Sequence, residues 1–135
     1  MAGTSFQVSH EWRFTLSKVV VVEDSTYMRS VVCAIAADAG HEVVATASNG
    51  LEGHAAVLEH DPDCLLTDLL MPEQGGLDMI EALRDGGWDG HVIVLSADVQ
   101  KSTVQKCEDL GVVKFLHKPP DRDELALALG AVVSP

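Results

Sequence analysis

The 135-residue sequence predicts an α/β fold, a doubly wound five-stranded parallel sheet with five helices. Three observations predict it. Short aliphatic runs alternate with helical patterns five times along the chain, and the connections between them are short. Such repeats favour right-handed crossovers, which place helices on both faces of the sheet. The first run, residues 19–22, is β-branched at every position, as expected for a strand that is buried on both faces.

Local signals bound each element in turn. Ser25 can cap a first helix after this strand, and Gly40 ends that helix. The apolar residues recur at helical spacing, at Met28, Val31, Val32, Ile35 and Ala39. The second strand is predicted over residues 41–47.

A capping box begins the second helix. Asn49 can cap the helix, with Glu52 reaching back, and Asp61-Pro62 ends it. The apolar face of this helix is predicted to consist of Ala55, Ala56 and Leu58. The third strand follows over residues 64–67.

The remaining elements continue the same alternation. Gly86 and Gly111 end the third and fourth helices, and Asp121 with Glu124 forms a capping box for the fifth. The predicted ranges are 77–85, 101–110 and 125–131 for these helices, and 91–95 and 112–116 for the last two strands.

The composition limits the classes of function. A net charge of −12 argues against binding to nucleic acid, whose phosphates repel an acidic surface. No apolar run approaches the roughly 20 residues of a bilayer span, and the N-terminus lacks the pattern of a secretory signal. We therefore expect a cytoplasmic protein without membrane insertion. Cys33, Cys64 and Cys107 lack C-x-x-C spacing, so we expect them to be reduced core residues.

The chain divides into a short N-terminal extension and one domain. Residues 1–17 show no clear period, although Trp12, Phe14 and Leu16 alternate with polar residues. This alternation fits either a short extra strand or an arm with aromatic contacts, and the role of the extension stays open. Residues 18–135 form the predicted domain, because no linker composition divides them.

Polar residues follow the predicted strands at the edge where the carboxyl ends meet. Glu23 and Asp24 close the first strand, and Asp68 closes the third. Ser96 closes the fourth strand, and Lys118 comes just after the fifth. In an open parallel sheet this edge forms the ligand crevice, and the flavodoxin-like strand order 2-1-3-4-5 brings the first and third strands together. We therefore expect these side chains to converge.

The chemistry of this set suits a metal ion and a phosphoryl group. Crowded carboxylates repel one another unless a cation compensates them, so Glu23, Asp24 and Asp68 predict a site for Mg²⁺ or Mn²⁺. Asp68 ends a strand before a loop, so we expect its carboxylate to be exposed and rigidly held. A carboxylate can attack phosphorus, Lys118 would neutralise charge, and the Ser96 hydroxyl would donate to a phosphoryl oxygen.

An ordered set of motifs resembles the response-regulator receiver domains. The motifs are Glu23-Asp24 after a valine run, Asp68-Leu-Leu-Met71-Pro72 with Gly76 following, Val-Leu-Ser96-Ala97, and Lys118-Pro119. The resemblance covers about residues 18–131 and is greatest to single-domain, chemotaxis-type receivers. Any one motif alone is weak, whereas the ordered set is highly specific.

The resemblance implies roles for the residues of the crevice. Asp68 matches the phosphoacceptor, and Lys118 matches the lysine that pairs with phosphoryl oxygens. Asp24 matches the direct metal ligand, Glu23 the ligand that acts through water, and the backbone carbonyl of Leu70 completes the protein ligands. The resemblance also implies a cis peptide bond after Lys118.

The resemblance further implies a switch. Ser96 matches the hydroxyl that moves onto the phosphoryl group, and Phe115 matches the switch aromatic. Their movement is expected to change the face formed by the fourth helix, fifth strand and fifth helix, within residues 98–116 and 121–131. Asp98 fits a helix cap or a solvated residue, and in the family its position can tune hydrolysis of the acyl phosphate.

The function that follows is that of a response regulator in two-component signalling. A sensor histidine kinase would phosphorylate Asp68 with Mg²⁺, docking near Thr26, Met28 and Arg29, and a downstream effector protein would receive the signal. The chain would not be an enzyme beyond catalysing its own phosphoryl transfer and dephosphorylation. A phosphatase is disfavoured, because Leu70 occupies the position of its second acid. Two alternatives stay open, a receiver cut from a larger multidomain kinase or regulator and a degenerate, non-phosphorylated protein-binding scaffold. The oligomeric state also stays open.

Overall fold

The computed structural model describes residues 17–98 and 100–133, so the predicted extension lies outside the described residues except for Ser17. Within these ranges the strands form one parallel sheet in the order β2-β1-β3-β4-β5, which confirms the predicted order. The strands are β1 (Lys18–Val22), β2 (Glu42–Ala47), β3 (Cys64–Thr67), β4 (His91–Ser96) and β5 (Lys114–His117). The helices are α2 (Thr26–Asp38), α3 (Gly50–His60), α4 (Gly76–Asp85), α5 (Lys101–Asp109) and α6 (Arg122–Val133).

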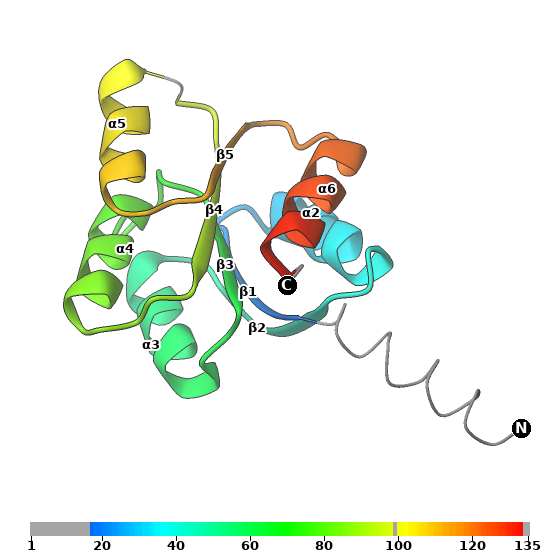
Figure 1. Ribbon diagram of the computed structural model, residues 1–135, viewed down its shortest axis with the longest axis horizontal. Coiled ribbons are helices and arrows are strands. Elements are labelled where there is room, and N and C mark those ends of the chain that lie inside the picture. Colours follow the sequence, from blue (N-terminus) through cyan, green and yellow to red (C-terminus); the bar gives the residue numbers. More distant parts are fainter. Residues whose placement is uncertain (1–16, 99, 134–135) are drawn as a thin grey trace, which may run out of the picture.

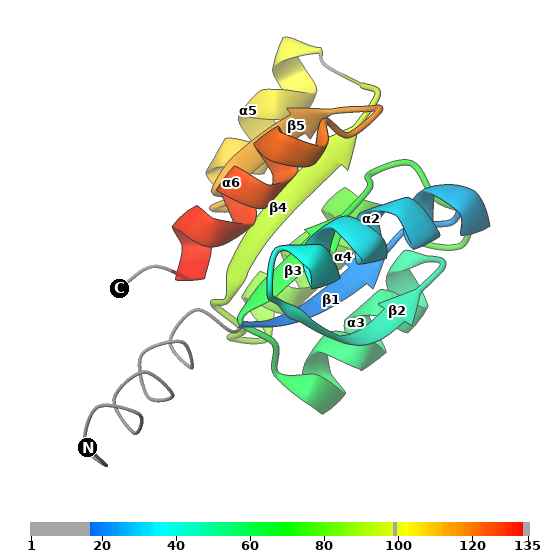
Figure 2. The same ribbon diagram turned by 90° about the vertical axis from the view of Figure 1, so that its right-hand side faces the viewer.

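Helices cover both faces of the sheet. In Figures 1 and 2, α3, α4 and α5 lie on one face, and α2 and α6 lie on the other. Each face has its own hydrophobic cluster, because successive side chains of a strand point to opposite faces. Val19 and Val21 of β1 join the cluster beneath α2 and α6, whereas Val20 and Val22 join the cluster beneath the other three helices. The doubly wound fold is thus confirmed.

Most predicted boundaries differ from the observed ones by at most one residue, and two predicted element starts shift by two residues or more for identifiable reasons. The fifth strand begins at Lys114 rather than at residue 112. The reason is that the Val112 N–H donates to the Cys107 carbonyl oxygen at the end of α5 (3.0 Å) and is not available to the sheet. The last helix begins at Arg122, three residues before the predicted start. Asp121 caps it, since its carboxylate accepts a hydrogen bond of 2.9 Å from the Glu124 N–H.

The predicted apolar face of α3 is right for Ala56, which packs against the core, and wrong for the other two residues. Leu58 is 61% exposed and Ala55 is also exposed, whereas Gly53 and Val57 are buried. A Cβ atom on Gly53 would lie 2.6 Å from Met79 Sδ, so α3 approaches the core through a residue without a side chain. A pattern built from apolar side chains passes over a glycine, so the predicted face omits Gly53, and it also omits Val57. In α2, Ala39 is likewise exposed, and Ala36 takes the buried position.

Two further sequence expectations concern the helices and the cysteines. No helix within residues 17–98 and 100–133 combines the length and the apolar character that a membrane span requires. All three cysteines are free thiols, as expected. Cys64 is fully buried, and burial raises its pKa to about 12, so this thiol is a core side chain rather than a reactive group.

Candidate functional site

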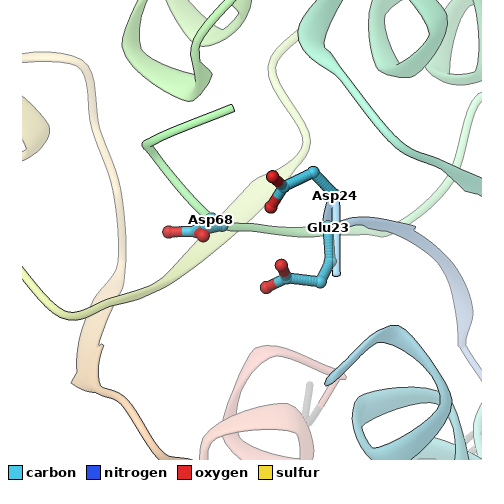
Figure 3. Close-up of side chains that lie close together, drawn as sticks. All are labelled: Glu23, Asp24 and Asp68. Carbon is cyan, nitrogen blue, oxygen red and sulfur yellow. The ribbon is translucent and has the colours of Figure 1, made fainter. Parts of the chain in front are cut away.

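The strand order brings three carboxylates to one point. Glu23 and Asp24 follow β1 and Asp68 follows β3, and these strands are neighbours with Val22 opposite Thr67. One carboxylate oxygen from each acidic residue lies within 4.8 Å of the others. In Figure 3 the three side chains extend from the two strand ends toward the same space. The predicted convergence of these residues is confirmed.

Lys118 lies between two of these carboxylates. Its ammonium Nζ is 2.6 Å from Glu23 Oε1 and 2.7 Å from Asp68 Oδ2. All three side chains are largely shielded from solvent, with exposed fractions of 18% for Lys118, 4% for Glu23 and 9% for Asp68. The peptide bond from Lys118 to Pro119 is cis, as the resemblance implied. One ammonium therefore compensates two buried acids, Glu23 and Asp68, that are 45 positions apart in the sequence.

Burial and pairing act in opposite directions on these groups. Burial raises the pKa of Glu23 above its ordinary value, although hydrogen bonds from Lys118 and the Ser25 N–H oppose this effect. Burial lowers the pKa of Lys118, but its hydrogen bonds to Asp68 and Glu23 outweigh burial and leave that pKa above its ordinary value. The lysine is therefore held in its charged form, as a group that neutralises a phosphoryl oxygen must be.

The expectation that the Asp68 carboxylate is exposed is wrong, since the residue is only 8% exposed. Lys118, from the far end of the sequence, covers it through the ion pair described above. The expected rigidity has a structural basis. The Leu69 N–H donates to Asp68 Oδ1 (2.6 Å), and the Asp68 N–H donates to the Val22 carbonyl oxygen (3.1 Å). Gly76 leaves room for this turn, because a Cβ there would collide with the Asp68 carbonyl oxygen.

The two predicted switch residues occupy neighbouring strands. Ser96 is fully buried at the end of β4, and its Oγ accepts a hydrogen bond of 3.1 Å from the Asp98 N–H. The Lys118 N–H donates to the Ser96 carbonyl oxygen (2.9 Å), which joins this strand end to the lysine. Phe115 on β5 is half-buried and packs against the cluster on the α3, α4 and α5 side. Leu70 follows Asp68 by two residues, and its side chain is 68% exposed.

Sequence reasoning missed two supports of Glu23. The Arg29 guanidinium donates to the Glu23 carbonyl oxygen (2.6 Å), and the Ser25 N–H donates to Glu23 Oε2 (3.0 Å). The resemblance assigns Arg29 only a contact with the kinase. Its position one turn into the helix that follows Glu23 could have indicated this second role, because the start of a helix folds back over the residues before it.

The donor set fits a hard divalent cation. Mg²⁺ prefers oxygen ligands and keeps several waters, so it needs few protein carboxylates. Glu23, Asp24 and Asp68 supply such oxygens, and Asp24 is exposed, which leaves a side open to water. Lys118 and the cation would then both interact with the Asp68 carboxylate and together compensate its negative charge.

Comparisons with known proteins agree with this geometry. Residues 19–130 match the family described as the response regulator receiver domain. The chain is 32% identical over 115 residues to the chemotaxis protein CheY of Thermotoga maritima, covering 85% of this chain and 96% of that protein. It is 42% identical over 102 residues to a protein-glutamate methylesterase/protein-glutamine glutaminase of Natronomonas pharaonis, covering 74% of this chain and 28% of that protein.

A solved structure and a longer relative complete the comparison. The signal receiver domain of the putative response regulator NarL from Mycobacterium tuberculosis has a TM-score of 0.82 and 27% identity, covering 87% of this chain and 95% of that one. The chain spans 40% of the length of a probable C4-dicarboxylate response regulator, DctR, of Priestia megaterium. With the family match over most of its length, the chain belongs to the response regulator receiver domains, the CheY-like modules of two-component signalling.

Proposed function

We propose that this chain is a phosphorylation-dependent switch in which Asp68 accepts a phosphoryl group from a sensor histidine kinase. The observation that carries the proposal is the Lys118 ammonium, which lies 2.7 Å from Asp68 and 2.6 Å from Glu23. A buried lysine held against an aspartate in an acidic crevice supplies positive charge where a phosphoryl group would add negative charge.

The proposed reaction transfers one phosphoryl group to Asp68, and no group is oxidised or reduced. An Asp68 oxygen attacks the phosphorus of a phosphohistidine, forming a P–O bond as the P–N bond breaks, and the imidazole nitrogen keeps the electron pair of that bond. Lys118 stays protonated and turns from the carboxylate toward a phosphoryl oxygen. Hydrolysis reverses the modification, since water attacks phosphorus and releases inorganic phosphate and the free carboxylate.

The remaining site residues bind and orient. Asp24, Asp68 and the Leu70 carbonyl would hold Mg²⁺ or Mn²⁺ directly, and Glu23 would hold it through water. When bound, the ion supplies charge neutralisation to the phosphoryl oxygens. Leu70 follows Asp68 by two residues and is exposed, and its apolar side chain would hinder the approach of water and prolong the phosphorylated state.

The signal would leave by protein contact. Ser96 turns its hydroxyl toward the phosphoryl group, and Phe115 follows into the vacated space, which changes the face formed by α5, β5 and α6 for a downstream effector. The chain would thus act in the cytoplasm, without an enzymatic activity beyond its own phosphorylation and dephosphorylation. The kinase would dock at the start of α2 near Thr26, Met28 and Arg29, of which Thr26 is exposed and the other two are half-buried.

The longer relatives support the alternative that this receiver is part of a larger multidomain protein. The chain spans 28% and 40% of two of the proteins that it matches, so a receiver of this type also occurs within larger regulators. The chemistry proposed for Asp68 is the same in either context.

Binding of beryllofluoride, a mimic of an aspartyl phosphate, tests the proposal. We expect calorimetry to detect binding to the wild-type chain that requires Mg²⁺ and is absent in Asp68→Asn. Asp109→Asn, which removes the same charge from the far end of α5, is the matched control and should bind as the wild type does. A folded wild-type chain that binds no beryllofluoride would contradict the proposal and favour the scaffold alternative.

A further inference from the structure

Asp98 connects the switch serine to the start of α5. Its N–H donates to Ser96 Oγ (3.1 Å), and its carboxylate accepts two further hydrogen bonds. Oδ1 accepts from the Gln100 N–H (3.0 Å), and Oδ2 accepts from the Thr103 hydroxyl (3.0 Å). One residue therefore ties a buried hydroxyl at the end of β4 to the first turn of the next helix.

The Asp98 carboxylate is hydrogen-bonded to the start of α5. Gln100 precedes the helix without capping it through its side chain, and the first turn contains no acidic residue. The start of a helix favours a nearby negative charge. Asp98 supplies this charge from outside the helix, and its carboxylate accepts from the N–H of Gln100, the residue before the helix, and from the Thr103 hydroxyl in the first turn.

The other end of α5 is held separately. Arg84 of α4 donates to the Leu110 carbonyl oxygen (2.9 Å) and lies over the Trp88 ring, 5.3 Å from its centre. It also donates to the Trp88 and Gly90 carbonyl oxygens (3.1 and 2.8 Å), which fixes the guanidinium in place. A change at the first turn would therefore move α5 about its far end rather than displace the whole helix.

We propose that Asp98 and Thr103 form a lock that holds α5 in its unphosphorylated position, with Asp98 as a positioning residue. This inference rests on the proposed function. When Ser96 Oγ turns toward a phosphoryl group on Asp68, the Asp98 N–H loses its acceptor. The connection after β4 then shifts, and the hydrogen bond between Asp98 and Thr103 is lost with it.

The lock has a measurable thermodynamic consequence. A ligand that binds one state more tightly gains affinity when an interaction specific to the other state is removed. Thr103→Val removes the hydroxyl and keeps the β-branched shape, and Asp98→Ala removes the carboxylate. Each should bind beryllofluoride with Mg²⁺ about two- to tenfold more tightly than the wild type, the range of one net hydrogen bond. Damage to the fold would weaken binding instead, so the sign separates the two effects.

The test uses the full chain and two measurements. Calorimetry compares the wild type, the two single variants and the double variant that combines them. Asp109→Ala is the control, because the Asp109 carboxylate accepts from Gln105 (2.9 Å) on the same helix, far from Ser96. Hydrogen exchange follows the amides of the first turn of α5, with and without beryllofluoride and Mg²⁺. In the wild type, protection of this turn should fall on binding, and in Thr103→Val it should already be low in the free protein.

The outcomes separate the lock from the function on which it rests. Tighter binding in both variants, wild-type affinity in Asp109→Ala and no added gain in the double variant would support the lock, because both substitutions remove the same bond. Wild-type binding with equal or weaker binding in the folded variants would overturn the lock and leave the proposed function standing. A wild-type chain that binds no beryllofluoride would overturn both.

Discussion

Replacing Lys118 by methionine removes the cation that compensates the acidic crevice while keeping a side chain of similar length. The Lys118 ammonium is paired with Glu23 and Asp68 at 2.6 and 2.7 Å, and both acids are buried. Asp24 adds a third carboxylate to the same cluster. Without the lysine, these negative charges face one another with no cation between them.

The magnitude follows from the geometry. Carboxylate oxygens within 4.8 Å of one another repel by at least about 3.5 kcal/mol per pair at an effective dielectric constant of about 20. The variant also escapes the cost of burying the ammonium, which offsets part of the loss. We therefore expect Lys118→Met to lower the free energy of unfolding by about 3 kcal/mol near pH 8, in line with the loss of one partner from a buried ion pair.

Urea unfolding of the variant and the wild type, with EDTA and then with Mg²⁺, measures this effect. Mg²⁺ should restore part of the lost stability to the variant, because it supplies positive charge to the same oxygens. Lowering the pH to 5 should also reduce the deficit, since a crowded carboxylate is then protonated. Lys106→Met is the control, because Lys106 is exposed and makes no ion pair within the described part of the chain. An unchanged free energy of unfolding, or a loss that neither Mg²⁺ nor acid reduces, would refute the reasoning.

Gly53, His41 and Asp24 allow further tests. Gly53→Ala places a Cβ 2.6 Å from Met79 Sδ, and we expect the melting temperature to fall with a loss of about 1–2 kcal/mol, since overpacking exceeds the gain in helix propensity. Burial lowers the pKa of His41, which hydrogen-bonds Ser17 at 2.7 Å, so below about pH 6.5 the unfolded chain takes up a proton that the native chain does not. Stability measured by urea should therefore fall on acidification by up to about 1.4 kcal/mol per pH unit, and less in His41→Asn. Asp24→Asn should weaken Mg²⁺ binding by about tenfold or more in calorimetry.

Matched variants make each of these results decisive. Gly130→Ala in α6 adds a Cβ that meets no described atom within 4 Å apart from its chain neighbours and the backbone of its own helix, so it should raise stability by up to about 1 kcal/mol. Equal effects at both glycines would contradict the packing argument. His117 is exposed, so His117→Asn should keep the acid sensitivity of the wild type, and the same slope in His41→Asn would exclude His41 as its source. Unchanged Mg²⁺ affinity in Asp24→Asn would remove that residue from the metal site.

The sequence by itself determined the types and order of the elements and the chemistry of the strand ends. These features are local. The β-branched run Val19–Val22 favours a strand buried on both faces, and Ser25 and Asn49 cap helices through bonds to residues three positions later, which the structure confirms. The strand order was also within reach, because the acids after β1 and β3 have a common purpose only if those strands are neighbours.

The tertiary structure alone decided burial and long-range pairing. Asp68 was expected to be exposed from its place at a strand end, yet Lys118, 50 positions away, closes over it. The buried face of α3 depends on how closely Gly53 approaches Met79, and the hydrogen bond from the Thr103 hydroxyl to Asp98 depends on how α5 lies relative to the end of β4. Each results from several elements packing at once, and sequence periodicity records only the preference of one element at a time.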